Sequence, residues 1–248
     1  MLEISIRAET IFSLFGLPVT NTLLMGWLVV LTLSALVFLF VRRPRIVPQG
    51  VQNVFEFAVE GVLGLMETAL GGRERAEKYF PLVATIFIFI LVSNWFGIFP
   101  FLGSIGVFAP GHGGEPAFVP LFRSSASDIN FTLALALISV LAIQAFGISA
   151  WGFVKHAGKY FTVKSPIQCA VGILEFISEL AKILSFSFRL FGNIFAGEVL
   201  LIITGFLVPY VVPVPFLMLE LFVGFVQALV FAMLTTVFLG IATASEHG

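Results

Sequence analysis

Charged side chains are scarce in this sequence of 248 residues, of which they make up 11%, while hydrophobic residues make up 59%. Soluble proteins carry about 25% charged residues, so a mean hydropathy of +1.08 is far outside their range. This composition excludes an ordinary soluble domain. Because long apolar segments without turn signals favour helices in a bilayer, we predict an all-α integral membrane protein.

Reactive and metal-binding residues are also rare. Cys169 is the single cysteine, which excludes an internal disulfide and a cysteine-based metal site. The sequence lacks a phosphate-binding Gly-Lys motif and a Ser/His/Asp or Cys/His nucleophile set. We therefore expect a protein that is not itself an enzyme and has no metal, cofactor or nucleic-acid partner.

Apolar segments and polar connections alternate along the chain. They predict one membrane domain over residues 1–248, with about six helices: five crossings and one amphipathic interfacial helix. The predicted elements are an external N-terminal segment at 1–20, a span at 21–41, an amphipathic helix at 51–70, a span at 81–100, an external loop at 101–128, a span at 129–153, a long tilted helix at 167–207 and a final helix at 216–242. The first apolar run precedes its arginines, unlike a secretory signal, so we expect no cleavage.

The cations predict an orientation. Nine of the thirteen Lys and Arg lie in three connections, and these can face one side only if helix 51–70 does not cross. The nine are Arg42, Arg43, Arg45, Arg73, Arg75, Lys78, Lys155, Lys159 and Lys164. The positive-inside rule then makes these connections and the C-terminus cytoplasmic, and the N-terminus and the loop around His112 external.

One permanent charge lies inside an apolar segment. Arg189 is near the middle of residues 167–207, and a guanidinium keeps its proton at any workable pH. Insertion scales put the cost of an arginine at the bilayer centre at about 3 kcal/mol. Arg189 therefore indicates either a functional site or a structural arginine that ties two helices together through a carboxylate or backbone carbonyls.

Residues 167–207 are too long for an upright span. As one helix they would extend about 60 Å, twice the hydrocarbon core. The segment either bends back around Gly192 and Asn193 or forms one long helix, held at an unusual tilt by a large partner.

The run RLFGNIFAGE at 189–198 and the later run LFVGFVQALVFAMLTTVFL resemble subunit a of the F-type ATP synthases. The similarity extends through TNTLLMGWLVV, FPLVATIFIFILVSNWFGIFP, SDINFTLALAL and TASEH, in the family's order. It implies a long, strongly tilted C-terminal helical hairpin, with a ring of c subunits, the peripheral-stalk b subunits and the lipid bilayer as partners. The resemblance and the short apolar loops favour the inner membrane of a bacterium, of an alphaproteobacterial or mitochondrial-like type.

The resemblance also implies residue roles in proton translocation. Arg189 matches the arginine that faces the ring carboxylates. Asn193, Glu198 and Gln227 match polar positions around two half-channels, and Glu175 matches an acidic position on the cytoplasmic route. At Glu220 some bacterial relatives have histidine, so this sequence departs from them, although either residue could relay a proton.

Helical geometry orders these residues independently. At about 100° per residue, one stripe roughly 80° wide on a continuous helix contains Glu175, Glu179, Lys182, Arg189 and Asn193. Glu198 lies about 180° from Arg189. Desolvation and mutual repulsion would make Glu198 or Glu220 a proton carrier. Alternatively, Glu175 and Glu179 lie at the cytoplasmic interface beside Lys182, as an ion pair.

Two other functions are compatible with these features. A stand-alone ion-coupled carrier could use Arg189 to bind an anionic substrate, and would be active as an isolated chain in liposomes. A structural scaffold would tolerate leucine at its polar intramembrane positions. The leading hypothesis is the proton-translocating stator, in which Arg189 separates two offset half-channels and Glu179 and Lys182 lie on the cytoplasmic side.

Overall fold

The computed structural model describes residues 8–14, 16–40, 50–99, 104–110, 116–160, 166–208 and 211–244. Its helices are α1 (Asn21–Phe40), α2 (Val51–Leu70), α3 (Arg73–Ile98), α5 (Ile129–Trp151), α6 (Phe153–Tyr160), α7 (Pro166–Leu207) and α8 (Pro213–Thr243). Two antiparallel hairpins pair β1 (Thr10–Leu14) with β2 (Leu17–Thr20) and β3 (Gly106–Pro110) with β4 (Pro116–Pro120). The short 3-10 helix η1 (Ser125–Ser127) precedes α5.

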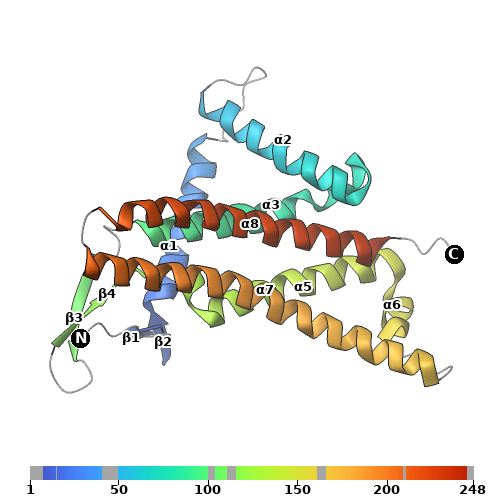
Figure 1. Cartoon of the computed structure of the whole chain (residues 1–248). Coiled ribbons are helices and arrows are strands. Elements are labelled where there is room, and N and C mark those ends of the chain that lie inside the picture. Colours follow the sequence, from blue (N-terminus) through green and yellow to red (C-terminus); the bar gives the residue numbers. More distant parts are fainter. Residues whose placement is uncertain are drawn as a thin grey trace.

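Five of these helices, α1, α3, α5, α7 and α8, are long and apolar enough to cross a membrane. The predicted all-α membrane fold is therefore confirmed. α2 is not among the five, and it lies along α3 and α8 (Figure 1). Of the residues used to predict the orientation, Arg42, Arg43, Arg45, His112 and Lys164 lie outside the described residues.

Some segments predicted as connections form regular secondary structure. The charged segment after Gly72 is the start of α3, which begins at Arg73 rather than Pro81. Arg73 binds Glu60 at 2.9 Å and Glu77 at 2.9 Å, which joins α2 to the first turns of α3. These hydrogen bonds hold the pKa of the Glu60 carboxyl below its usual value.

Three other segments differ from the prediction: the one before α1, the one between α3 and α5, and the one after α5. The N-terminal segment and the predicted loop at 101–128 each contain a strand hairpin. Prolines at the ends of β3 and β4 resemble turn residues in the sequence, but they are compatible with isolated edge strands. The cationic connection after α5 contains the amphipathic helix α6.

The start of α1 is tied to the start of α5 by buried polar contacts. Asp128 caps α5 by accepting a hydrogen bond from the Asn130 backbone N–H at 2.9 Å. The Thr22 hydroxyl donates to the same carboxylate at 3.0 Å, and Ser125 Oγ donates to the Thr22 carbonyl at 2.9 Å. These bonds satisfy polar groups that burial would otherwise leave unpaired.

The long helix α7 is continuous over 42 residues, so the alternative of a bend at Gly192 is wrong. α7 and α8 lie side by side as an antiparallel hairpin, and α1 crosses their direction steeply (Figure 1). On α7, Phe186, Leu190 and Ile194 recur every four residues and are buried. Phe186 stacks on Phe231 of α8 at 4.7 Å between ring centroids, and both belong to a core that α2, α3 and α5 share with α7 and α8.

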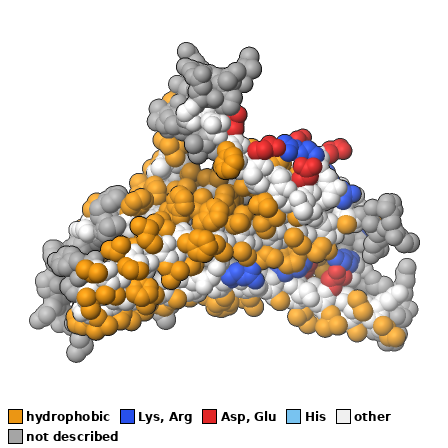
Figure 2. All heavy atoms as spheres, turned by 45° about the horizontal axis from the view of Figure 1, so that its top comes forward, with side chains coloured by type: hydrophobic (Ala, Val, Ile, Leu, Met, Phe, Trp, Pro, Cys, Tyr) orange, Lys and Arg blue, Asp and Glu red, His pale blue; other side chains and the backbone are white. Residues whose placement is uncertain are grey.

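The outer surface is largely apolar. Figure 2 shows hydrophobic side chains spread over the long helices, with acidic and basic side chains in two groups, one at the upper right and one within the lower part of the view. Exposed large residues on the spans include Leu31 at 67%, Phe188 at 54% and Phe222 at 64%. Such an area exceeds what a soluble monomer exposes, so lipid or partner helices must cover it.

Gly172 permits the contact between α6 and α7. A Cβ there would lie 2.5 Å from the Tyr160 carbonyl oxygen and 3.3 Å from that of Lys159. We expect Gly172→Ala to displace α6 and destabilise the chain by about 1 to 3 kcal/mol. Thermal unfolding of the purified chain measures this effect. The matched control is Gly64→Ala, where a Cβ meets no atom within 4 Å, and equal melting temperatures for the two variants would contradict the packing.

Candidate functional site

Arg189 projects from the middle of α7 and is partly exposed. Its Nη2 donates to Ser185 Oγ at 3.4 Å, a long bond within the same helix. Among the described residues no carboxylate forms an ion pair with Arg189, whereas Arg73 and Arg123 both have such partners. Arg189 is therefore not a structural arginine that joins two helices through a carboxylate within the described chain.

Small side chains surround Arg189 on the exposed face of α7. Ser185, Gly192, Asn193 and Ala196 are all exposed there, and a Cβ at Gly192 would meet no atom within 4 Å. Small residues let a neighbouring backbone approach closely. This face can accept another helix and bring a group on it to the guanidinium.

Glu198 is bound from a different part of the chain. Arg123, which lies between β4 and η1, donates through Nε to Oε1 at 2.9 Å and through Nη2 to Oε2 at 3.4 Å. The Arg123 side chain is 11% exposed and that of Glu198 is 26% exposed. Such a two-point contact fixes the orientation of the Glu198 side chain.

Glu220 has no such compensation. It is 8% exposed on α8, and its Oε2 has no hydrogen-bond partner in the described chain. α7 makes room for it at Gly197, where a Cβ would lie 2.8 Å from Glu220 Oε1. The carboxyl thus lies against the α7 turn that holds Glu198.

Further buried polar atoms without partners lie between α3, α8 and the segment before η1. They are Ser93 Oγ, Asn94 Oδ1 and Ser124 Oγ. Asn94 Nδ2 donates to the Gly224 carbonyl at 3.0 Å, one turn along α8 from Glu220. Ser124 packs against Gly97 of α3 and follows Arg123 in sequence. Buried polar atoms of this kind are commonly satisfied by water.

The opposite end of α7 carries a second group of charges. Glu175 forms an ion pair with Lys159 of α6. Glu179 binds Lys182 at 2.6 Å, as the i,i+3 alternative proposed, and Glu179 Oε2 has no partner in the described chain. The ammonium of Lys182 also lies 4.6 Å from the ring centroid of Phe238 on α8.

Comparison with known proteins identifies the family. A family model described as ATP synthase A chain matches residues 23–240. The chain belongs to this family, whose members are the a subunits of F-type ATP synthases. It is 36% identical to ATP synthase subunit a of Campylobacter jejuni over 210 residues, which are 84% of this chain and 83% of the relative.

Two other relatives extend the match. ATP synthase subunit a of Gloeobacter violaceus is 37% identical over 222 residues, or 89% of this chain and 82% of the relative. That of Moorella thermoacetica is 31% identical over 236 residues, or 94% of this chain and 95% of the relative. The family assignment therefore covers nearly the whole chain.

Within this family's fold, the structure brings some of the predicted site residues together and separates others. Glu220 packs against Gly197, the neighbour of Glu198 in sequence, whereas Asn193 is exposed and Gln227 is partly buried, and neither side chain bonds to another described residue. The sequence argument missed Arg123 and Lys159 as partners of Glu198 and Glu175. The scarcity of cations was the available signal, because a buried carboxylate in an apolar protein needs one of few possible partners.

Proposed function

We propose that the chain is the proton-translocating stator subunit of a rotary ATP synthase, and that Arg189 separates two offset half-channels. The observation that carries the proposal is the position of Arg189. It has no carboxylate partner in the described chain and lies on an exposed face of small residues, while carboxylates lie toward both ends of α7. The family match gives no support to a stand-alone carrier.

The external half-channel, in this proposal, leads to Glu220. Its polar lining is Ser124, Ser93 and Asn94, whose partnerless buried atoms would bind water. Arg123 would hold the Glu198 side chain beside this route.

The cytoplasmic half-channel would leave α7 along Glu175, Glu179 and Lys182. Glu175 lies 18 residues before Asn193, or about 27 Å along the helix axis. This offset matters because a continuous pore would dissipate the proton gradient, whose free energy is about 2.3 kcal/mol per charge per 100 mV. With the channels offset, each proton must be carried between them by another component.

That component would be a ring of c subunits docked against the face around Arg189. A ring carboxyl would take a proton from one half-channel and release it to the other. The guanidinium of Arg189 would attract the ionised carboxylate and oppose direct exchange between the channels. Peripheral-stalk b subunits would hold the chain against the turning ring. Asn193 and Gln227, polar and partly or fully exposed on α7 and α8, would lie near this contact.

We further propose a bacterial inner-membrane location with an external N-terminus and a cytoplasmic C-terminus. With five helices crossing and α2 not crossing, Lys78 and Lys159 would lie on the same side of the membrane, as the positive-inside rule expects. The β3–β4 hairpin would then be external, beside the entrance to the external half-channel.

Side-specific labelling tests both the orientation and the half-channels. In a Cys169→Ala background, Lys78→Cys and Lys159→Cys should react only from the cytoplasmic side, and Ile105→Cys, 48% exposed before β3, only from outside. Silver ions should reach Glu220→Cys from outside alone and Glu175→Cys from the cytoplasm alone. Access to Glu220→Cys solely from the cytoplasm would show that the half-channels are wrongly placed.

The stator assignment has a separate test in the purified complex. Chain solubilised in mild detergent should co-purify with a ring of small helical-hairpin subunits, and the whole complex, with its catalytic sector, should pump protons on ATP addition once it is reconstituted in sealed vesicles. Proton transport by the isolated chain in liposomes, without any ring, would favour the carrier instead.

A further inference from the structure

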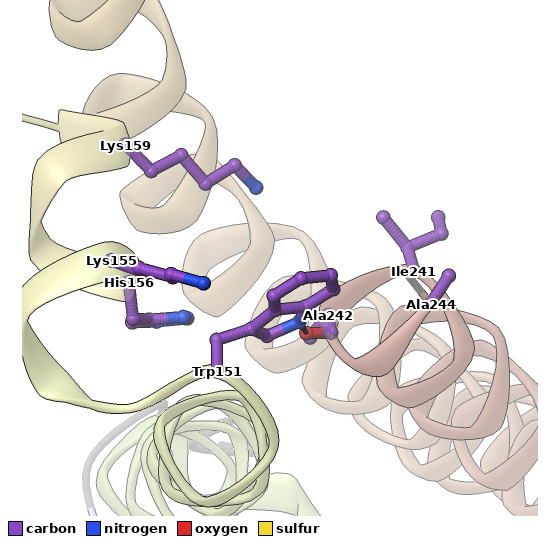
Figure 3. Close-up of a pocket in the computed structure, with 7 residues that line it drawn as sticks. All are labelled: Trp151, Lys155, His156, Lys159, Ile241, Ala242 and Ala244. Atoms are coloured by element: carbon purple, nitrogen blue, oxygen red, sulfur yellow. Dashed lines mark hydrogen bonds between the residues drawn. The ribbon is translucent and has the colours of Figure 1, made fainter. Parts of the chain in front are cut away.

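A cavity of about 440 Å³ lies where the end of α5, the helix α6 and the end of α8 meet. Its lining residues are Trp151, Lys155, His156, Lys159, Ile241, Ala242 and Ala244. Figure 3 shows the three basic residues extending from α6 toward the end of α8, with the Trp151 indole between the two elements. The cavity is separate from Arg189 and from the Glu220 region.

Hydrogen bonds fix the walls of this cavity. Trp151 Nε1 donates to the Ala242 carbonyl at 3.2 Å, which ties α5 to α8. Gln144 Oε1 lies 2.6 Å from His156 Nε2 and accepts a bond from the Tyr160 hydroxyl at 3.1 Å. Burial, and next the charge of Glu179, raise the pKa of the Tyr160 phenol, so it retains this proton. Because Gln144 Oε1 can only accept, His156 Nε2 donates this hydrogen bond. The two bonds to Gln144 hold α6 against α5.

The charge in the cavity is positive and only partly compensated. Lys159 pairs with Glu175 of α7. Lys155 has no ion pair with any carboxylate in the described part of the chain, although its side chain lines the cavity. The Lys155 ammonium is therefore available to an anion, and the Lys159 ammonium, which is already paired with Glu175, also lines the cavity.

The depth of the cavity indicates what kind of anion reaches it. Trp151 is the last residue of one candidate span, and another ends at Thr243. The cavity thus lies at the level where hydrocarbon gives way to phospholipid headgroups. Its surroundings are apolar and open, since Phe153 is 69% exposed, Val154 84% and Ile241 61%. Trp, Lys and exposed aliphatic side chains together are typical of the membrane interface.

We propose that this cavity binds the phosphate headgroup of an anionic phospholipid, with Lys155 as the main charge partner and the exposed apolar residues of α6 and α8 against the acyl chains. Basic pockets between the cytoplasmic ends of membrane helices suit such headgroups. The bound lipid would join α6 to α8 and so steady the Lys159 contact with Glu175. The proposal requires only that the chain is embedded in a membrane, and it does not depend on proton translocation.

Photo-crosslinking locates the lipid directly. The full chain is reconstituted in phosphatidylcholine vesicles with a small fraction of phosphatidylglycerol that carries a photoreactive group near its headgroup. We expect crosslinks to residues 151–160 and 241–244, several-fold above those from photoreactive phosphatidylcholine. Lys155→Gln should lower the anionic crosslink about fivefold, since a lysine near the surface contributes about 1 kcal/mol.

The controls separate this site from general attraction. Lys78→Gln removes an exposed lysine near the start of α3, which does not line the cavity, and should leave the crosslink unchanged. Equal loss in both variants, or equal yields from the two lipids, would overturn the proposal. Soluble glycerol phosphate in excess should not compete. If it abolishes the crosslink, the cavity binds a free phosphate anion and the lipid assignment is wrong.

Discussion

Replacing Arg189 by alanine should abolish ATP synthesis driven by a proton gradient, and should also abolish ATP-driven proton pumping. At about 4 Å and an effective dielectric constant of about 20, a guanidinium and a carboxylate attract each other by about 4 kcal/mol, or roughly a thousandfold in occupancy. Without that attraction a ring carboxyl could pass Arg189's position while still protonated. Passive proton leak through the membrane sector should then rise while coupling is lost.

Arg189→Lys should fail as well, although it keeps a positive charge. An ammonium has a point-like charge and can lose its proton when desolvated, whereas the guanidinium stays charged and presents a planar set of donors. The surrounding small residues, such as Gly192 and Ala196, expose the guanidinium to a partner rather than shielding it. The substitution should therefore reduce coupled synthesis nearly as much as alanine does.

The matched control is Arg75→Ala, an exposed arginine in the first turn of α3. This substitution should leave synthesis and pumping close to wild type, because Arg75 is on α3 and the proposed ring contact is on α7. The measurements are ATP synthesis and ATP-driven quenching of a pH-sensitive dye in inverted vesicles. Pumping at the wild-type rate in Arg189→Ala would remove the basis of the stator proposal.

Local sequence patterns predicted much of the fold. Long apolar runs located the five candidate spans, and the spacing of apolar residues identified α2 as amphipathic. The angular argument on α7 also agrees with the contacts, because Glu198 is bound by Arg123 on the side away from Arg189. These inferences succeeded because each depends on residues close together in one helix.

Contacts between distant residues were not predictable in this way. Arg123 and Glu198 are 75 residues apart, and no periodicity within either segment identifies the other as its partner. The same applies to Lys159 with Glu175 and to Gly197 with Glu220. Single glycines such as Gly197 and Gly172 look like ordinary small residues in the sequence, and only tertiary packing reveals which side chain each one accommodates.

The surroundings of Glu198 and Glu220 suggest that the two carboxylates have different roles. Glu198 is bound to a largely buried arginine, while Glu220 is buried and forms no ion pair with any cation in the described part of the chain. Changing either residue removes one carboxylate, but the physical consequences differ. Loss of Glu198 removes a carboxylate that binds the largely buried Arg123 at two points, which costs stability. Loss of Glu220 removes only the group proposed to carry protons.

We therefore expect Glu220→Gln to slow proton entry from outside by tenfold or more while the chain remains folded, because glutamine keeps the shape of glutamate but cannot titrate. Glu198→Gln should lower both transport and melting temperature, and Arg123→Gln with Glu198→Gln should recover the melting temperature, since it removes both members of the pair. The control is Glu56→Gln on the exposed face of α2, which should change neither quantity. Passive proton flux in vesicles stripped of the catalytic sector, together with thermal unfolding of the purified chain, distinguishes the two effects. Wild-type flux in Glu220→Gln would exclude this carboxyl from the external half-channel, even if Arg189 proves essential.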